Sequence, residues 1–237
     1  MTAREAYEKA ATAQKRMPEL EPIIIQDAQS ACCYSVDVIQ GRWLEAEPLI
    51  MKSAYNAYLY ARDIMQGRWL EAEQVIMQDS TAACCYAKNI LKGRWLEAEP
   101  TIIKKAEWSY YYAHHIIKGR WTEAEETIMQ NSFYACAYAC GLIKGRWTEA
   151  EPVIVQDEEC ACLYAKYIIK GRWTDAEEAI SKSGYSQLYI EYFFDEPMIT
   201  KEQVDIIEWQ RKKQVGYFAP ARLFENKVSL LDIMVIE

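Results

Sequence analysis

Histidine is scarce in this sequence, which has only two, the neighbours His114 and His115, among its 237 residues. There is also no glycine-rich phosphate-binding loop, and the carboxylates recur too regularly to single out one acid and one base. A catalytic site should interrupt such a pattern with a nucleophile and its partner, and residues 15–196 contain no such interruption. We therefore expect a protein that is not an enzyme and that needs no cofactor.

Long apolar runs and an excess of basic residues are also missing. No stretch approaches the about 18 uninterrupted apolar residues of a membrane span, and the first residues lack the apolar core of a signal peptide. The 27 Lys and Arg are outnumbered by 35 Asp and Glu, which gives a formal net charge of −8. Binding to nucleic acid needs a basic surface. We expect a cytoplasmic protein with neither a membrane nor a nucleic acid as its partner.

Cysteine is present, but in a pattern that favours neither disulfides nor zinc. The eight cysteines include the adjacent pairs Cys32-Cys33 and Cys84-Cys85. A long chain without a secretory signal favours reduced thiols. Zinc needs four ligands that converge on one point, and the two histidines lie in a segment, 93–118, that has no cysteine. We therefore expect no metal site.

What the sequence does contain is a tandem repeat of 26 residues. Gly-Arg-Trp begins at Gly41, Gly67, Gly93, Gly119, Gly145 and Gly171, and a degenerate copy begins at Lys15. The recurring positions read G-R-W-x-E-A-E-x-x-I, then a variable segment, then A-x-x-Y-A-x-x-I-I-K. Both halves predict helices, and two helices this short are not stable alone in water, so neighbouring repeats must bury each other's apolar faces.

The repeat predicts an all-α fold, specifically an α-solenoid with a right-handed superhelix, built from seven helix-turn-helix repeats over 15–196. Residues 1–14 have apolar residues at helical spacing and are expected to form an N-terminal capping helix. Residues 197–237 leave the repeat pattern and are expected to form a C-terminal capping or accessory segment.

The second half of each repeat has the clearer helix signal. Ala57, Tyr60, Ala61 and Ile64 follow the i, i+3, i+4, i+7 spacing of one helical face. Such a helix should end at the glycine of the next repeat, here Gly67, in the left-handed conformation.

The first half of each repeat predicts a shorter helix, in which Trp43, Ala46 and Ile50 share a face. Pro48, and the prolines at the same position of other repeats, conflict with a helix that starts at the tryptophan, since a helix already under way would lose a hydrogen bond there. Two readings remain open: the opening turn is distorted, or the helix starts later.

The unit Gly-Arg-Trp-x-Glu-Ala-Glu joined to Tyr-Ala-x-x-Ile-Ile-Lys resembles a repeat of uncharacterised bacteriophage and other viral open reading frames. The resemblance covers 15–196. This chain differs from that pattern in having Leu or Thr, and not Pro, after most of its tryptophans. The resemblance implies a viral accessory protein that acts in the host cytoplasm, and it implies no chemistry.

Two recurring columns have both a functional and a structural reading. The arginines could grip phosphates with their guanidinium forks, but each has carboxylates such as Glu45 and Glu47 nearby, which favours a structural ladder. The tryptophans could stack on bases, but at a fixed repeat position they more often fill the seam between helices. The possible anion-binding residues are Arg42, Arg68, Arg94, Arg120, Arg146 and Arg172.

The variable positions lie in the linker from the first to the second helix of each repeat and at the start of the second helix. They are rich in aromatic residues, which are common at interface hot spots. Those predicted to contact a partner are Tyr55, Tyr58, Trp108, Tyr110, Tyr111, Phe133, Tyr134 and Tyr185. We expect a non-catalytic scaffold that binds a protein partner and so inhibits or redirects it. One alternative is a module that holds a nucleotide or other phosphorylated small ligand in the solenoid groove, and another is a self-assembling structural protein. The sequence does not determine the oligomeric state.

Overall fold

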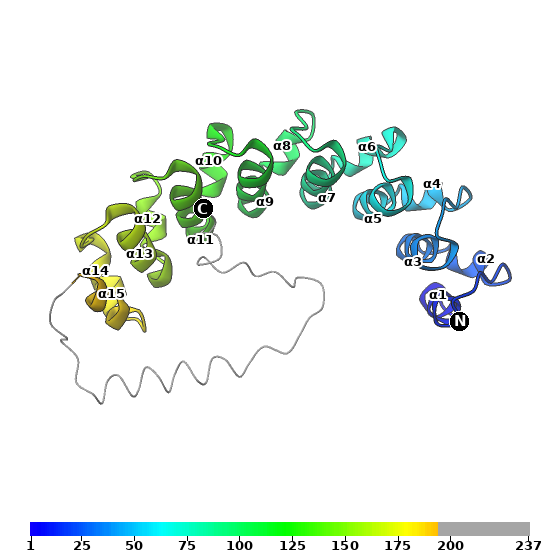
Figure 1. Cartoon of the computed structure of the whole chain (residues 1–237), viewed down its shortest axis with the longest axis horizontal. Helices are drawn as coiled ribbons and strands as arrows, with labels where there is room; N and C mark the ends of the chain where they lie inside the picture. Colours follow the sequence, from blue (N-terminus) through cyan, green and yellow to red (C-terminus); the bar gives the residue numbers. More distant parts are fainter. Residues whose placement is uncertain (194–237) are drawn as a thin grey trace. The chain divides into compact units, whose positions relative to one another are not determined.

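The computed structural model describes residues 1–193, and every secondary-structure element in this range is a helix (Figure 1). The chain divides into an N-terminal unit, Met1–Ala124, and a second unit that begins at Glu125. The predicted all-α class with repeating helix pairs is confirmed. No helix among the described residues is long and apolar enough to span a membrane. The predicted accessory segment 197–237 lies outside the described residues.

Helix α1 (Ala3–Thr12) comes first and packs on α2 and α3 through its fully buried Ala6 and Ala10. Helix pairs follow. Their first helices are α2 (Glu21–Ile24), α4 (Glu47–Ile50), α6 (Leu70–Ile76), α8 (Glu99–Ile102), α10 (Thr122–Ile128), α12 (Glu151–Ile154) and α14 (Thr174–Ser181). Their second helices are α3 (Ala28–Tyr34), α5 (Ala54–Tyr60), α7 (Ser80–Tyr86), α9 (Ala106–Tyr112), α11 (Ser132–Tyr138), α13 (Glu158–Tyr164) and α15 (Ser186–Phe193).

Six of the second helices continue into a wider, π-helical turn. These turns are η1 (Ser35–Ile39), η2 (Ala61–Met65), η3 (Ala87–Leu91), η4 (Ala113–Ile117), η5 (Ala139–Ile143) and η6 (Ala165–Ile169).

The start of each first helix depends on whether the repeat contains the proline. In the repeat with Pro48, residues 44–46 form a turn and α4 starts at Glu47, so that the proline is the second helical residue. There its missing N–H costs nothing, because the first N–H groups of a helix have no partner within it. Where Gln74 replaces the proline, α6 starts earlier, at Leu70. Of the two readings left open, the later start is confirmed.

The recurring aromatic residues form the core. The tryptophans of the repeat are only 3–5% exposed, which confirms that they fill the seams between helices. The tyrosine of each second helix is buried, and its ring centroid lies 5.0–5.3 Å from that of the tryptophan that begins the next repeat. These pairs are Tyr34–Trp43, Tyr60–Trp69, Tyr86–Trp95, Tyr112–Trp121, Tyr138–Trp147 and Tyr164–Trp173.

The second helices do not end as predicted, because no glycine of the described residues has a positive φ. The left-handed residue is the one before the glycine, as at Gln40, where φ is 53°. The wider turn of η1 brings the reversal forward by one residue, and the N–H groups of Gln40 and Gly41 both point to the carbonyl of Ser35. The same conformation recurs at Gln66, Lys92, Lys118, Lys144 and Lys170, with φ of 51–59°.

Candidate interaction surface on helix α9

Six of the seven repeat arginines form a two-pronged ion pair with a glutamate of their own repeat. Arg42 donates from Nε and Nη2 to the two carboxylate oxygens of Glu47, both at 2.8 Å. The same pairing joins Arg16 to Glu21, Arg68 to Glu73, Arg94 to Glu99, Arg146 to Glu151 and Arg172 to Glu177, and Arg120 also has an interaction partner. The guanidinium edges suited to a phosphate are therefore already occupied by carboxylates. Anion binding by these arginines stays a prediction.

A tyrosine hydroxyl completes this network. Tyr60 donates to Oε1 of Glu47 at 3.0 Å and accepts the backbone N–H of Trp43 at 2.8 Å. The Arg42 guanidinium, together with the Tyr60 hydroxyl, holds the pKa of Glu47 below its usual value, and burial raises the pKa of Tyr60 to about 12. Glu47 thus stays ionised and Tyr60 stays protonated at neutral pH, so the recurring polar residues serve the frame of each repeat.

The predicted partner-binding aromatic residues differ widely in exposure. Tyr55 is 42% exposed, whereas the side chains of Tyr58 and Tyr110 are buried. The others are half-buried: Trp108, Tyr111, Phe133, Tyr134 and Tyr185. We leave Tyr58 and Tyr110 out of any proposed surface, because a partner cannot reach a buried ring.

These residues lie in separate places. Tyr55 packs against Tyr58 on α5, with ring centroids 5.9 Å apart. Phe133 and Tyr134 lie together on α11, with centroids 5.2 Å apart. The hydroxyl of Tyr185 donates to Glu159 at 2.8 Å.

Helix α9 and its continuation η4 carry a stripe of rings at helical spacing. Trp108 and Tyr111 have ring centroids 5.7 Å apart, those of Tyr111 and His115 are 4.2 Å apart, and those of His114 and His115 are 4.7 Å apart. Lys88 reaches from η3 to within 4.4 Å of the Tyr111 ring centroid and also bonds to its hydroxyl. We call these five residues the aromatic–lysine cluster; all belong to the N-terminal unit.

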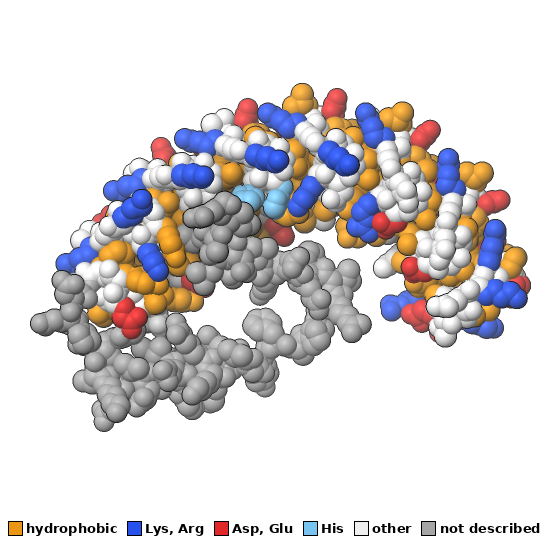
Figure 2. Space-filling model, viewed as in Figure 1, with side chains coloured by type: hydrophobic (Ala, Val, Ile, Leu, Met, Phe, Trp, Pro, Cys, Tyr) orange, Lys and Arg blue, Asp and Glu red, His pale blue; other side chains and the backbone are white. Residues whose placement is uncertain are grey.

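The charge of this cluster comes from Lys88. Loss of solvation, followed by the charges of Lys88 and His114, lowers the pKa of His115 to about 4. Burial and the charge of Lys88 also lower the pKa of His114. Both imidazoles are therefore neutral at pH 7, and Figure 2 shows them at the surface with cationic side chains close by. The cluster presents flat rings and one cation, which suits contact with another molecule more than proton transfer.

The contact between Lys88 and Tyr111 was not predicted from the sequence, although a signal for it exists. Lys88 occupies the position that His114 has in the next repeat, and Tyr111 lies one helical turn before His114. Residues related in this way meet when consecutive second helices lie side by side, as α7 and α9 do.

Metal ligation has no candidate among residues 1–193, where no group of three or more His, Cys, Asp or Glu side chains converges. All eight cysteines are free, and five of them are buried. Burial is the main cause that raises the pKa of Cys32 to about 12. These thiols behave as small apolar core residues.

No protein-family model, curated protein or solved structure matches this chain. The resemblance to viral repeat proteins accordingly stays an expectation.

Proposed function

We propose that this chain is a non-catalytic repeat scaffold that binds a protein partner through the aromatic–lysine cluster. The scaffold would be the seven-repeat, right-handed α-solenoid expected from the sequence. The helix pairs that recur with the 26-residue period support this architecture, since the ion pair, the hydroxyl bridge and the ring contact recur along the chain.

The observation that carries the proposal is the half-exposed stripe of Trp108, Tyr111 and His115 beside Lys88. The recurring aromatic residues of the repeat are buried, whereas Trp108 and Tyr111 are half-exposed and occupy positions that vary between repeats: Trp108 aligns with Ala82 and Tyr134, and Tyr111 aligns with Cys85 and Ala137. Trp and Tyr supply large contact areas with few rotatable bonds, and a cation over a ring adds attraction. The repeat that contains α9 therefore keeps the buried residues of the other repeats and differs from them at its surface, where a partner would bind.

The experiment is affinity capture from bacterial cytoplasmic extract with the full chain and two variants. The test variant, Trp108→Ala with Tyr111→Ala, introduces residues that the chain itself uses at these positions, Ala82 and Ala137. The matched control is Leu96→Thr, because Leu96 is 64% exposed and other repeats have threonine there. It removes exposed apolar surface away from the cluster.

We expect the wild-type chain and the Leu96→Thr control to retain a stoichiometric protein that the double variant loses. A photo-crosslinking residue at position 108 should join that protein to the chain covalently. The proposal is rejected if no stoichiometric protein is retained, or if the double variant retains it as well as the control does.

The two sequence-based alternatives have less support as the main function. A phosphorylated ligand held by the arginine column would compete with the glutamates that already pair with those arginines. Self-assembly has no specific contact in its favour. Sedimentation velocity over a range of concentrations would detect it as a species that grows with concentration.

A further inference from the structure

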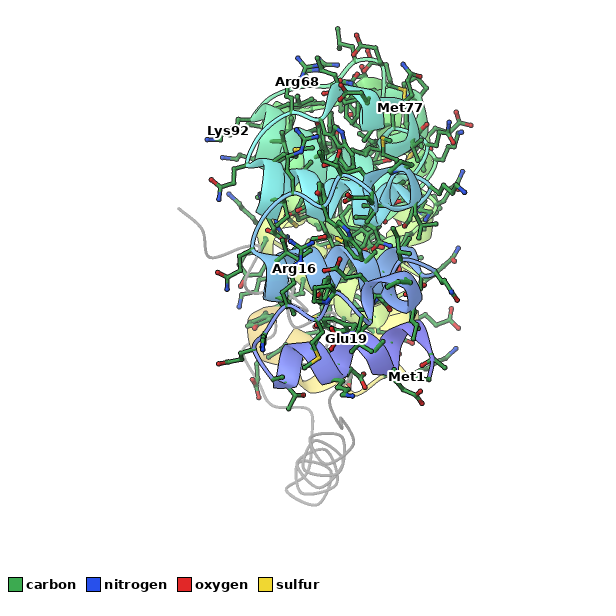
Figure 3. All side chains as sticks on the ribbon, turned by 90° about the vertical axis from the view of Figure 1, so that its right-hand side faces the viewer. Met1, Arg16, Glu19, Arg68, Met77 and Lys92 are labelled. Carbon is green, nitrogen blue, oxygen red and sulfur yellow. The ribbon has the colours of Figure 1, made fainter. Side chains whose placement is uncertain are left out.

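A hollow of about 330 Å³ lies between the ends of η3 and η4, next to the aromatic–lysine cluster and within the N-terminal unit. Its lining residues are Lys88, Lys92, Gly93, His115, Ile116 and Lys118. We call it the lysine hollow. Lys92 ends η3, and Figure 3 shows it on the opposite side of the molecule from Met77, so the hollow lies at the edge where second helices end.

Three lysines line the lysine hollow, and none of its lining residues carries a carboxylate. None of Lys88, Lys92 and Lys118 takes part in an ion pair with another residue of the described range. This distinguishes them from the repeat arginines, which are neutralised by glutamates five residues away. Like charges that converge without a counter-charge repel one another, and an anion between them removes that repulsion.

The backbone fixes two of these lysines in place. Lys92 and Lys118 are the left-handed residues that end η3 and η4, with φ of 54° and 59°. Between them, Gly93 contributes no side chain to the hollow, although an added Cβ there would meet only a carbonyl oxygen at 3.9 Å. The conformation of Gly93 therefore does not require glycine.

The preceding junction, between η2 and η3, does not have three unpaired lysines. Its corresponding positions hold Arg62, Gln66, Asn89 and Lys92. Arg62 is paired there with Asp63 at 2.6 Å. Three unpaired lysines are thus a property of the η3–η4 junction and not a consequence of the repeat.

We propose that the lysine hollow binds a compact phosphorylated anion, held by Lys92 and Lys118 from consecutive helix ends with Lys88 beside them. Ammonium groups bind phosphate oxygens as mobile point charges. A volume of about 330 Å³ is at the small end for ligand sites, which favours a di- or triphosphate group over a larger ligand. His115, neutral at pH 7, offers one more hydrogen bond. This site does not depend on the protein-partner proposal.

The test is calorimetric titration of the full chain with inorganic triphosphate, without magnesium, against sodium sulfate at equal ionic strength. The test variant is Lys92→Gln with Lys118→Gln, and the control is Lys144→Gln with Lys170→Gln. Both remove two charges from left-handed helix ends, and both introduce the residue that the chain itself uses at Gln40 and Gln66. Circular dichroism verifies that each variant is folded.

We expect wild type and control to bind within about twofold of each other, and the test variant to bind at least about tenfold more weakly. Triphosphate should also shift the ring resonances of His115, which are easily assigned because the chain has only two histidines. The proposal is overturned if triphosphate at millimolar concentration does not bind, if both double variants weaken binding equally, or if sulfate binds as well as triphosphate. Intact triphosphate binding without protein capture would reject the partner proposal and leave this one standing.

Discussion

Replacing Tyr60 with phenylalanine removes one hydroxyl from the core and leaves the ring contact with Trp69, at 5.0 Å between centroids, in place. The hydroxyl is the acceptor for the backbone N–H of Trp43 at 2.8 Å and a donor to Glu47 at 3.0 Å. A water molecule cannot take the place of the hydroxyl beside the Trp43 N–H and Glu47 unless the packing opens, because Tyr60 is fully buried and Trp43 is only 4% exposed.

The expected loss of unfolding free energy follows from these two bonds. A buried N–H left without an acceptor costs about 1–3 kcal/mol, and a hydrogen bond to a charged group contributes about 1.5–3 kcal/mol. Glu47 keeps its ion pair with Arg42, so the second loss is only partial. We predict that Tyr60→Phe destabilises the protein by about 2–4 kcal/mol, a large fraction of the stability of a typical domain.

Urea unfolding at pH 7 measures this loss, and amide hydrogen exchange at Trp43 localises it. The control is Tyr55→Phe on the same helix, α5, where the side chain is 42% exposed and the change should stay within about 0.5 kcal/mol. The reasoning is refuted if the two variants are equally stable, or if the Trp43 amide exchanges at the wild-type rate in Tyr60→Phe.

Four further outcomes are expected. Burial raises the pKa of Tyr60 and Tyr86 from 10.0 to about 12, so the folded chain keeps protons that the unfolded chain loses. The free energy of unfolding should therefore keep its full value below pH 10 and fall as the pH rises to 12. Circular dichroism and tyrosinate absorbance measure this loss. Gln66→Gly should stabilise by about 1 kcal/mol in urea unfolding, because Gln66 has φ 51°. Lys105→Asp should also stabilise by about 1 kcal/mol, because Lys105 alone among the described caps of the second helices α3 to α13 makes no side-chain cap bond. Cys32, whose pKa is about 12, should react with a thiol reagent only at the rate of unfolding.

The buried helix faces could be predicted because they depend on local geometry. Ala57, Tyr60 and Ala61 are fully buried, as their helical spacing predicts, and so are Ala46 and Ile50 of the first helix. The spacing within one helix determines which side chains share a face, whatever the neighbours are.

Contacts between helices were harder to predict, since they depend on how consecutive helices align. Tyr58 was expected to be available to a partner, yet its hydroxyl accepts a hydrogen bond from Asn89 of the next repeat at 2.8 Å and its ring is buried. Helical periodicity cannot show that a neighbouring helix covers a position. The Lys88–Tyr111 contact was missed for the same reason.

The left-handed helix ends were assigned to the wrong residue for a different reason. Glycine is the usual residue in that conformation, so Gly41 was the natural choice over Gln40. The prediction assumed an α-helical last turn, whereas η1 has one residue more in its turn, which no spacing in the sequence reveals. A left-handed Gln or Lys has a free-energy cost, and this cost is present in each repeat whose second helix ends in this way.

Because each core tyrosine bonds to its own repeat through the hydroxyl and packs on the next through its ring, the junctions of the N-terminal unit from Tyr34–Trp43 to Tyr112–Trp121 share one hydrogen bond and one ring contact. Because no junction of this unit differs from the others in these contacts, we expect the unit to lengthen under mechanical load in steps of one repeat.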